Sequence, residues 1–447
     1  MGEAMITRRG GGGLKIDGLL DEYVVSSGSV SAGDFVKWVF EIKSLGATGK
    51  VTNTNKFSQI SAAEVDDSHA IIVYQSYTPD VYPTACIVAF TESGAAAGTA
   101  TQIGPTGTDT DGGTNVCVYS IGDNQFLVFS LKDSSSKWYA GKLTVDNGYT
   151  ITVNNQMALQ SEIDSRIKHI WRIDGNKFGG IYYASSYLNI SVLEWENNKI
   201  AARKGSKYYA YYGMTENAIA NGFTPITGEK YACITSEKTS DKMFLTYFTD
   251  TGTTVTLDTP TSVSSSGGAG LGVLKLPNGK YLLPCSAQVS GVNIYLGVRL
   301  ITVTSNAITM GTVTQITTTA MNSGQRASQI HMANLPGGRV ILVRNYDATG
   351  PYKANYLIIE VLGDTVTTLT DSVQISGPDA TDLSFTNGSI IGLGNGVAMF
   401  YSAGSTRIIQ ILGGSDSIIK CASGEYVGGL ATEDGAENET IKVYRPA

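Results

Sequence analysis

Short hydrophobic segments separated by polar turns run along the chain. In one recurring pattern an apolar residue precedes a tight turn and a hydrophobic segment follows, as in LPNGKYLLP at 276–284. The turns carry Gly, Asn or Asp, which tolerate the positive φ angles of short hairpin turns. Each copy therefore predicts a β-hairpin. The copies begin at residues 65, 121, 173, 226, 276, 335 and 393, at intervals of 50 to 59 residues.

A second hairpin follows each of these, with first strands such as KMFLTYF at 242–248 and NYLIIEVL at 355–362. Four short strands in about 55 residues, repeated seven times, predict an all-β fold with a seven-bladed β-propeller over residues 56–415. Strands apolar on both alternations, such as AIIVY at 70–74, fit blades that are covered on both faces. The alternative is a β-sandwich, which also has many short strands but does not keep one hairpin at a near-constant period.

The two ends of the chain lie outside this repeat. Residues 14–55 and 416–447 each offer strand-like segments around polar turns, and SAGDFVKWV at 31–39 is echoed by ENETIKVYR at 437–445. We expect these ends to form a small β-barrel or sheet domain into which the propeller is inserted. Alternatively, one end supplies a strand that closes the seventh blade. Residues 1–13 are too rich in glycine to be ordered without a partner.

Charge and composition exclude several classes of function. The net charge of −7 argues against binding to nucleic acid, which needs a basic surface. No apolar segment reaches the roughly 18 residues of a membrane helix, and the N-terminus lacks the apolar region of a secretory signal. The cysteines are scattered without metal-binding spacing, which predicts buried free thiols in a protein made in a reducing cytosol. They are Cys86, Cys117, Cys233, Cys285 and Cys421.

The terminal sequences carry a resemblance. AMITRRGGGG at 4–13 resembles the start of tail-fibre and minor structural proteins from phages of Gram-positive gut bacteria. GGLATEDGAENETIKVYRP at 428–446 and the strand at 31–39 are similar to a small β-domain of phage virion proteins. The resemblance implies a virion structural protein whose opening peptide, with Arg8 and Arg9, docks into the particle beside other virion proteins. A tail-fibre or baseplate role is favoured, and a head fibre or capsid decoration protein is the alternative.

Clustered tyrosines are the candidate binding residues. SKYYAYYGM at 206–214, IYYASSY at 181–187 and YQSYTPDVYP at 74–83 place aromatic rings in the segments between strands. Such rings stack on sugars and anchor protein interfaces, so we expect a site for a host cell-surface glycan. Attachment proteins gain strength from copy number, which predicts a homo-oligomer. The alternative is packing between blades. The candidate residues are Tyr208, Tyr209, Tyr211 and Tyr212, followed by Tyr77 and Tyr82.

No catalytic residue, metal site or cofactor is predicted. His169 and His331 fall at equivalent positions in two repeats, where they are expected to line the central channel, and two histidines are too few for a metal site. A carbohydrate-active propeller enzyme, a hydrolase or lyase, is the alternative from another class, and it needs two converging carboxyl groups. The carboxylate pairs lie in turn-like sequence: Asp66/Asp67, Asp109/Asp111 and Asp379/Asp382.

Overall fold

The structure, a computed structural model, contains β-strands and no α-helix in the part of the chain that it describes, so the all-β prediction is confirmed. Within that part, no helix could cross a membrane. The described residues are 18–25, 28–50, 60–76, 82–91, 94–104, 116–132, 137–164, 166–167, 170–184, 187–197, 199–208, 219–236, 243–264, 273–289, 293–304, 307–318, 330–335, 338–345, 354–374, 383–393, 396–403, 406–420, 429–437 and 439–446.

The chain divides into two compact units. The first combines Met1–Ser44 with Leu412–Ala447, and the second is Leu45–Ile411. Within the first unit, β1 (Gly18–Val25) pairs antiparallel with β36 (Thr440–Pro446), so strands from the two ends of the chain share a sheet. Further pairs in this unit include β2 (Ser29–Val30) with β35 (Gly435–Ala436), the start of β3 (Phe35–Lys50) with β34 (Gly429–Ala431), and β34 with β36.

The core of the first unit is small and apolar. Val25, Val30, Val36, Ile441 and Val443 are buried together in it. The turn after β2 is fixed by carboxylates, because Asp34 accepts a hydrogen bond from the Ser31 amide and Asp434 accepts one from the Ala32 amide. A carboxylate from the C-terminal segment therefore helps to shape a turn of the N-terminal one.

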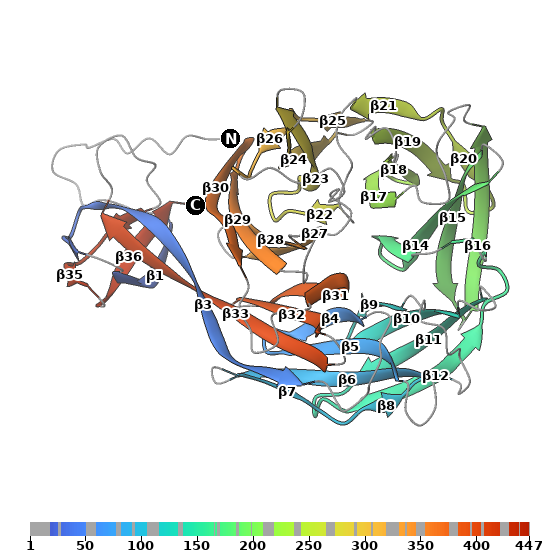
Figure 1. Cartoon of the computed structure of the whole chain (residues 1–447), viewed down its shortest axis with the longest axis horizontal. Helices are drawn as coiled ribbons and strands as arrows, with labels where there is room; N and C mark the ends of the chain where they lie inside the picture. Colours follow the sequence, from blue (N-terminus) through green and yellow to red (C-terminus); the bar gives the residue numbers. More distant parts are fainter. Residues whose placement is uncertain are drawn as a thin grey trace. The chain divides into compact units, whose positions relative to one another are not determined.

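The second unit is built mainly of antiparallel sheets of consecutive strands, with one parallel pairing where Ala47 of β3 lies opposite Gly94 (Figure 1). Sheets β9–β12, β13–β16 and β27–β30 have four strands each, and the outer strand of three others is split in two. The first three sheets in chain order contain β4 (Ile60–Asp66), β5 (His69–Ser76), β6 (Tyr82–Thr91), β7 (Gly94–Ala97) and β8 (Thr101–Gln102); β9 (Val116–Gly122), β10 (Gln125–Lys132), β11 (Lys137–Val145) and β12 (Ile151–Leu159); and β13 (Ile170–Asp174), β14 (Lys177–Ala184), β15 (Tyr187–Glu196) and β16 (Lys199–Tyr208).

The next three sheets repeat this order of strands, whereas the last group in chain order has three consecutive strands, of which the third also pairs with β3. Together they contain β17 (Ile219–Thr227), β18 (Lys230–Ser236), β19 (Met243–Asp250), β20 (Val255–Leu257) and β21 (Thr261–Ser264); β22 (Leu274–Lys275), β23 (Tyr281–Val289), β24 (Asn293–Val303), β25 (Ile308–Met310) and β26 (Thr314–Gln315); β27 (Ile330–Leu335), β28 (Arg339–Asn345), β29 (Ala354–Leu362) and β30 (Thr365–Gln374); and β31 (Leu383–Leu393), β32 (Gly396–Ala403) and β33 (Thr406–Lys420).

The hairpins predicted from the sequence are confirmed. Each of the seven patterns corresponds to an antiparallel pair of consecutive strands, from β4–β5 to β31–β32. Between β9 and β10, Asp123 and Asn124 have φ angles of 49° and 54°. A two-residue turn with both φ angles positive matches the twist of the strands that it joins, which is why Asp and Asn occur there.

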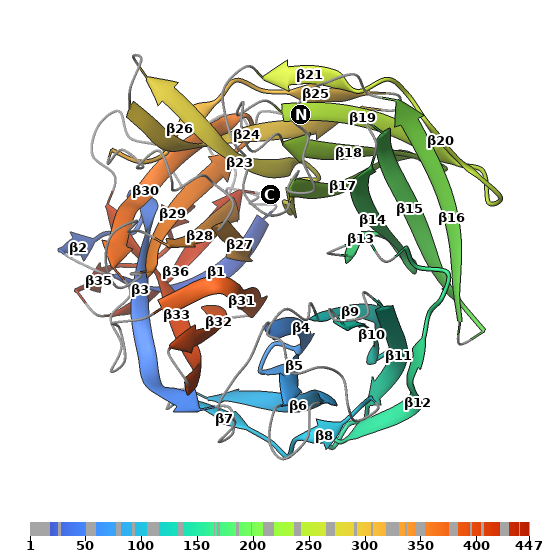
Figure 2. The ribbon, with the colours of Figure 1, turned by 45° about the vertical axis from the view of Figure 1, so that its right-hand side comes forward.

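Consecutive sheets lie face to face in the ribbon (Figure 2). Buried apolar side chains from neighbouring sheets form shared cores. In β5, Ile71 and Val73 belong to the core shared with sheet β9–β12, whereas Ile72 and Tyr74 face a core that includes Ile391 of β31. Because both faces of the sheet are covered, its strands are apolar on both alternations. Thus the last sheet in chain order packs against the first, and the Ala62 amide also donates to Ser389 Oγ at 3.3 Å.

Candidate functional site

The third sheet, β13–β16, carries the most exposed pair of aromatic side chains among the described residues. Its outer hairpin turns at Asn197, which has a φ of 47°, and Glu196 pairs with Lys199 across that turn. Without any bulge the register continues along both strands, so that Tyr187 opposes Tyr208 at their far end. The position of the turn at Asn197 therefore sets the register that places Tyr187 opposite Tyr208.

Tyr187 and Tyr208 form an exposed edge-to-face pair. Their ring centroids are 5.4 Å apart and the rings are inclined by 68°. The exposed fractions are 42% for Tyr187 and 57% for Tyr208. Aromatic rings bury large areas in cores and interfaces, so two rings held together in solvent mark a surface suited to a ligand.

Polar side chains lie on the same face of the sheet as this pair. Asn189 opposes Ser206, two residues inward from the tyrosines, and cross-strand partners point to one face. The Asn189 amide donates to the carbonyl of Tyr187 at 3.1 Å, which stabilises the start of β15. We call the surface formed by Tyr187, Asn189, Ser206 and Tyr208 the aromatic platform.

The segment that connects sheet β9–β12 to sheet β13–β16 covers the rest of this face. Ile200 donates its amide to Gln160 Oε1 at 3.2 Å, and Ile163 packs in one core with Leu193 and Trp195. These positions are buried, as is Ser191. The covered region ends between Ser191 and Asn189, beyond which the face is accessible.

Arg166, in the same connecting segment, borders the covered region. Its guanidinium lies 4.1 Å from the ring centroid of Tyr182 and donates twice to Asp164, at 2.9 Å in each case. Arg166 thereby lowers the pKa of Asp164 to about 2, and burial together with Asp164 raises the pKa of Tyr182 to about 12. Because Tyr182 opposes Asn189, this ion pair and its tyrosine lie next to the platform.

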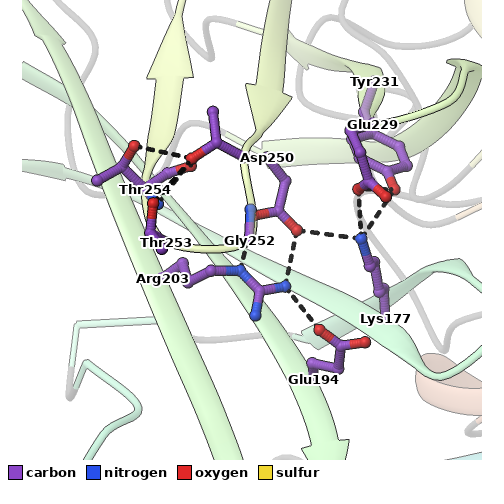
Figure 3. Close-up of polar contacts among 10 residues, drawn as sticks. Lys177, Glu194, Arg203, Glu229, Tyr231, Asp250, Gly252, Thr253 and Thr254 are labelled. Carbon is purple, nitrogen blue, oxygen red and sulfur yellow. Dashed lines mark hydrogen bonds and ion pairs between the residues drawn. The ribbon is translucent and has the colours of Figure 1, made fainter.

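The opposite face of the same sheet carries an ionic network (Figure 3). Arg203 donates to Asp250 of the next sheet through Nε at 2.6 Å and Nη2 at 2.7 Å, and to Glu194 at 2.9 Å. Lys177 pairs with Asp250 at 3.2 Å and with Glu229. We define the interface network as Lys177, Glu194, Arg203, Glu229 and Asp250.

Asp250 is the centre of this network and is completely buried. Burial alone would raise the pKa of its carboxyl, but hydrogen bonds from Arg203, Gly252 and Lys177 outweigh that effect and lower the pKa. A general acid needs the opposite, a carboxyl whose pKa is raised towards neutrality. The interface network therefore suits a contact between sheets better than a reaction centre.

Tyr208 and Tyr82 are the two predicted binding residues that the structure describes. Tyr208 ends β16 in the aromatic platform, whereas Tyr82 begins β6 of another sheet, where it is half-buried and opposes Ser76. The structure thus does not bring these two together in one sheet. The other predicted residues lie outside the described ranges: Tyr77, Tyr209, Tyr211, Tyr212, Arg8 and Arg9.

Tyr187 was not named among the predicted binding residues, although its segment IYYASSY at 181–187 is one of the tyrosine-rich candidates and the sequence contains a sharper signal for it. Asn197 lies in a hairpin turn, and counting outward from that turn pairs residue 187 with residue 208. Lys204, which the prediction also missed, lies on the same strand face as Tyr208 because side chains alternate along a strand. Counting the strand register from this turn would have identified both Tyr187 and Lys204 as neighbours of Tyr208.

The structure describes only some of the carboxylates that were considered for the enzyme alternative. Asp66 is the last residue of β4, beside the turn to β5, where its carboxylate accepts hydrogen bonds from Ser68, His69 and Tyr149. These bonds lower its pKa in spite of partial burial, whereas a general acid needs a raised pKa. His331 lies on β27, the first strand of its sheet, and is half-buried. Asp109, Asp111, Asp379, Asp382 and His169 lie outside the described residues.

The described cysteines are buried, as predicted, and form no disulfide bond with one another. Burial raises the pKa of each of their thiols to about 12, so they are poor nucleophiles and poor metal ligands at neutral pH. Within the described ranges, no group of three His, Cys, Asp or Glu side chains is placed to hold a metal ion. Cys86, Cys117, Cys233 and Cys285 belong to this set, and Cys421 lies outside it.

Comparison with known proteins finds similarity in structure alone. No protein-family model and no curated protein matches the sequence. Similar solved structures include the β-propeller domain of Nup133 from Vanderwaltozyma polyspora, with 10% identity over 83% of this chain and 97% of that one and a TM-score of 0.41. The β-propeller domain of the Trilobed protease from Pyrococcus furiosus has 7% identity over 83% of this chain and 100% of that one, with a TM-score of 0.42.

An α-L-arabinanase from Penicillium chrysogenum is also similar in structure. It has 12% identity over 86% of this chain and 98% of its own length, with a TM-score of 0.36. Identities this low carry no information about activity, because unrelated functions share the same fold.

Proposed function

We propose that the second unit is a seven-bladed β-propeller and that the first is a small β-domain, a barrel or sheet, built from the two ends of the chain. Each predicted hairpin opens a new antiparallel sheet, and neighbouring sheets share apolar cores such as the one that joins Phe129 to Phe178. The contact of β31 with β4 supports ring closure. Closure covers the faces that would otherwise be exposed at the two ends of the stack.

This propeller is displayed by a phage virion structural protein, a tail-fibre or baseplate component that binds the host surface. The terminal sequences that resemble virion proteins support the location, with Met1–Gly13 as the docking peptide to other virion proteins. The observation that carries the binding role is the exposed pair of Tyr187 and Tyr208 on a sheet whose other face is fixed by ion pairs. Several copies in a homo-oligomer would turn a weak site into firm attachment.

A binding role fits the chemistry of the described residues better than catalysis does. The buried carboxylate of Asp250 is held by two cations, and Asp66 is committed to its own turn. Two tyrosines fixed in place offer contact area without loss of side-chain entropy, which is the usual basis of a recognition surface. A sugar ring stacked on Tyr208 and bounded by Tyr187 is the arrangement we propose.

Imaging and product analysis test this proposal together. Virions labelled with antibody against the protein should show label at the tail or baseplate, and label on the capsid would contradict the attachment role. The purified protein, incubated with host cell-wall polysaccharide, should bind it without releasing reducing ends or unsaturated uronic products. Release of either product would identify an enzyme and overturn the binding-only role.

A further inference from the structure

We infer that the aromatic platform binds an acidic polysaccharide, with sugar rings against Tyr187 and Tyr208 and an acid group of the same glycan paired with Lys204. This inference rests on the glycan-binding role proposed above and adds the charge of the ligand. It predicts that carboxylate or phosphate groups on the glycan are required for binding.

Lys204 shares its strand face with the platform. It opposes Ser191 on β15, as Ser206 opposes Asn189 and Tyr208 opposes Tyr187, so all three residues of β16 point to one side of the sheet. Lys204 is four residues from Tyr208, about 13 Å along an extended strand. A ligand that contacts both ends therefore spans more than one sugar ring, and Ser206 lies between them as a hydroxyl partner.

The ammonium group of Lys204 has no counter-ion among the described residues. It is exposed and takes part in none of the ion pairs found there. The acidic side chain nearest to it in the strand pairing, Glu194 opposite Ala201, belongs to the interface network on the other face. Its charge is thus available to an external anion.

Arg166 contributes to the shape of the binding site but adds no net positive charge to it. Its guanidinium is neutralised by the two hydrogen bonds to Asp164, and it stacks on Tyr182 at the border of the platform. Among the residues that the structure describes, the positive charge of the site is therefore that of Lys204. In a chain of net charge −7, polyanions are repelled overall, so an acidic glycan is held only where a local cation meets an aromatic surface.

An array of oligosaccharides tests the inference with the full-length protein. The array carries galacturonate, glucuronate, sialic acid and polyol-phosphate glycans beside carboxyl-reduced or phosphate-free counterparts. We expect binding to at least one acidic glycan, with loss on the matched neutral counterpart and weakening as salt is raised. The acidic glycan that binds shows whether the acid group is a carboxylate or a phosphate.

Three single-residue variants test which side chains contribute to glycan binding. Lys204→Gln should weaken binding about fivefold and remove most of its salt dependence, and Tyr208→Ala should weaken it at least about tenfold. Lys199→Gln is the matched control: it removes the same charge from the same strand, near the hairpin turn and opposite Glu196. It should bind as the wild type does.

The outcomes separate the two proposals. If neutral and acidic glycans bind equally and Lys204→Gln has no effect while Tyr208→Ala abolishes binding, the acidic ligand is wrong and the glycan-binding role stands. If no glycan binds on the array and the protein also fails to bind host cell-wall polysaccharide, both proposals are wrong.

Discussion

Lys177 donates to Asp250 across the boundary between two sheets, with Nζ and Oδ2 3.2 Å apart (Figure 3). Lys177 directly follows a hairpin turn and opens the second strand of its sheet. His69 and Lys280 occupy the same position in their own repeats. His69 stacks on Tyr149 at 3.5 Å between ring centroids.

Lys280 contacts the next sheet in the same way, through the carbonyl of Gly363 at 2.8 Å and the carboxylate of Asp364. In all three cases the partner lies in the next sheet, at or beside the turn between its third and fourth strands. One position of the sequence repeat therefore makes the contact between sheets repeatedly, through different side-chain chemistry.

Removing Asp250 should destabilise the second unit strongly. Asp250→Ala leaves Arg203 and Lys177 without their shared partner in a largely buried site, so we expect a loss of roughly 3–5 kcal/mol in the free energy of unfolding. Urea denaturation of the purified protein measures it. The exposed ion pair of Lys280 and Asp364 provides the control. Asp364→Ala should change the free energy of unfolding by no more than about 1 kcal/mol. Equal losses for the two variants would show that burial of the network does not matter.

The ion pair of Asp164 and Arg166 makes stability depend on pH in a defined window. The pKa of Asp164 is lowered from 3.8 to about 2 in the folded protein. The stabilisation is therefore complete above the unfolded pKa and is lost as pH falls through the folded one. The difference in unfolding free energy between wild type and Asp164→Asn should be constant above about pH 5 and should shrink between about pH 4 and pH 2. A difference that stays constant down to pH 2 would contradict the pair.

A glycine at the contact of two sheets should resist substitution. A Cβ on Gly205 of β16 would lie 2.2 Å from the carbonyl oxygen of Val255 in the next sheet, and a backbone oxygen cannot move aside cheaply. We expect Gly205→Ala to lower the free energy of unfolding by roughly 1–3 kcal/mol. Gly148→Ala is the control, because a Cβ there would lie 3.4 Å from its nearest atom, Oδ1 of Asp146. Its free energy of unfolding should be close to that of the wild type, and denaturation of both variants measures the difference. Stability equal to the control would show that the two sheets do not approach so closely.

The buried cysteines should be unreactive in the folded protein. Cys117 and Cys233 are completely buried, and burial raises the pKa of each thiol to about 12. Iodoacetamide at pH 8 should leave them unmodified until denaturant is added, as peptide mass spectrometry would show. Rapid labelling of either residue under native conditions would place it at the surface.

Local patterns predicted the hairpins because a turn such as Asp123–Asn124 needs residues that accept positive φ angles, and those residues are visible in the sequence. The same patterns did not reveal Asp250 as the partner of Lys177, since the pairing depends on how two sheets meet. Tyr208 was found from local aromatic density. Tyr187 also lies in a tyrosine-rich segment, but its pairing with Tyr208 comes from strand register, which the single turn at Asn197 sets at a distance.

Binding of the purified protein to intact bacteria of the host species tests the central claim most directly. The wild type should bind these cells and compete with phage adsorption, and the variant Tyr187→Ala/Tyr208→Ala should fold normally but bind at least about tenfold more weakly. Binding of the folded double variant at the level of the wild type would contradict the claim that the aromatic platform recognises the host surface.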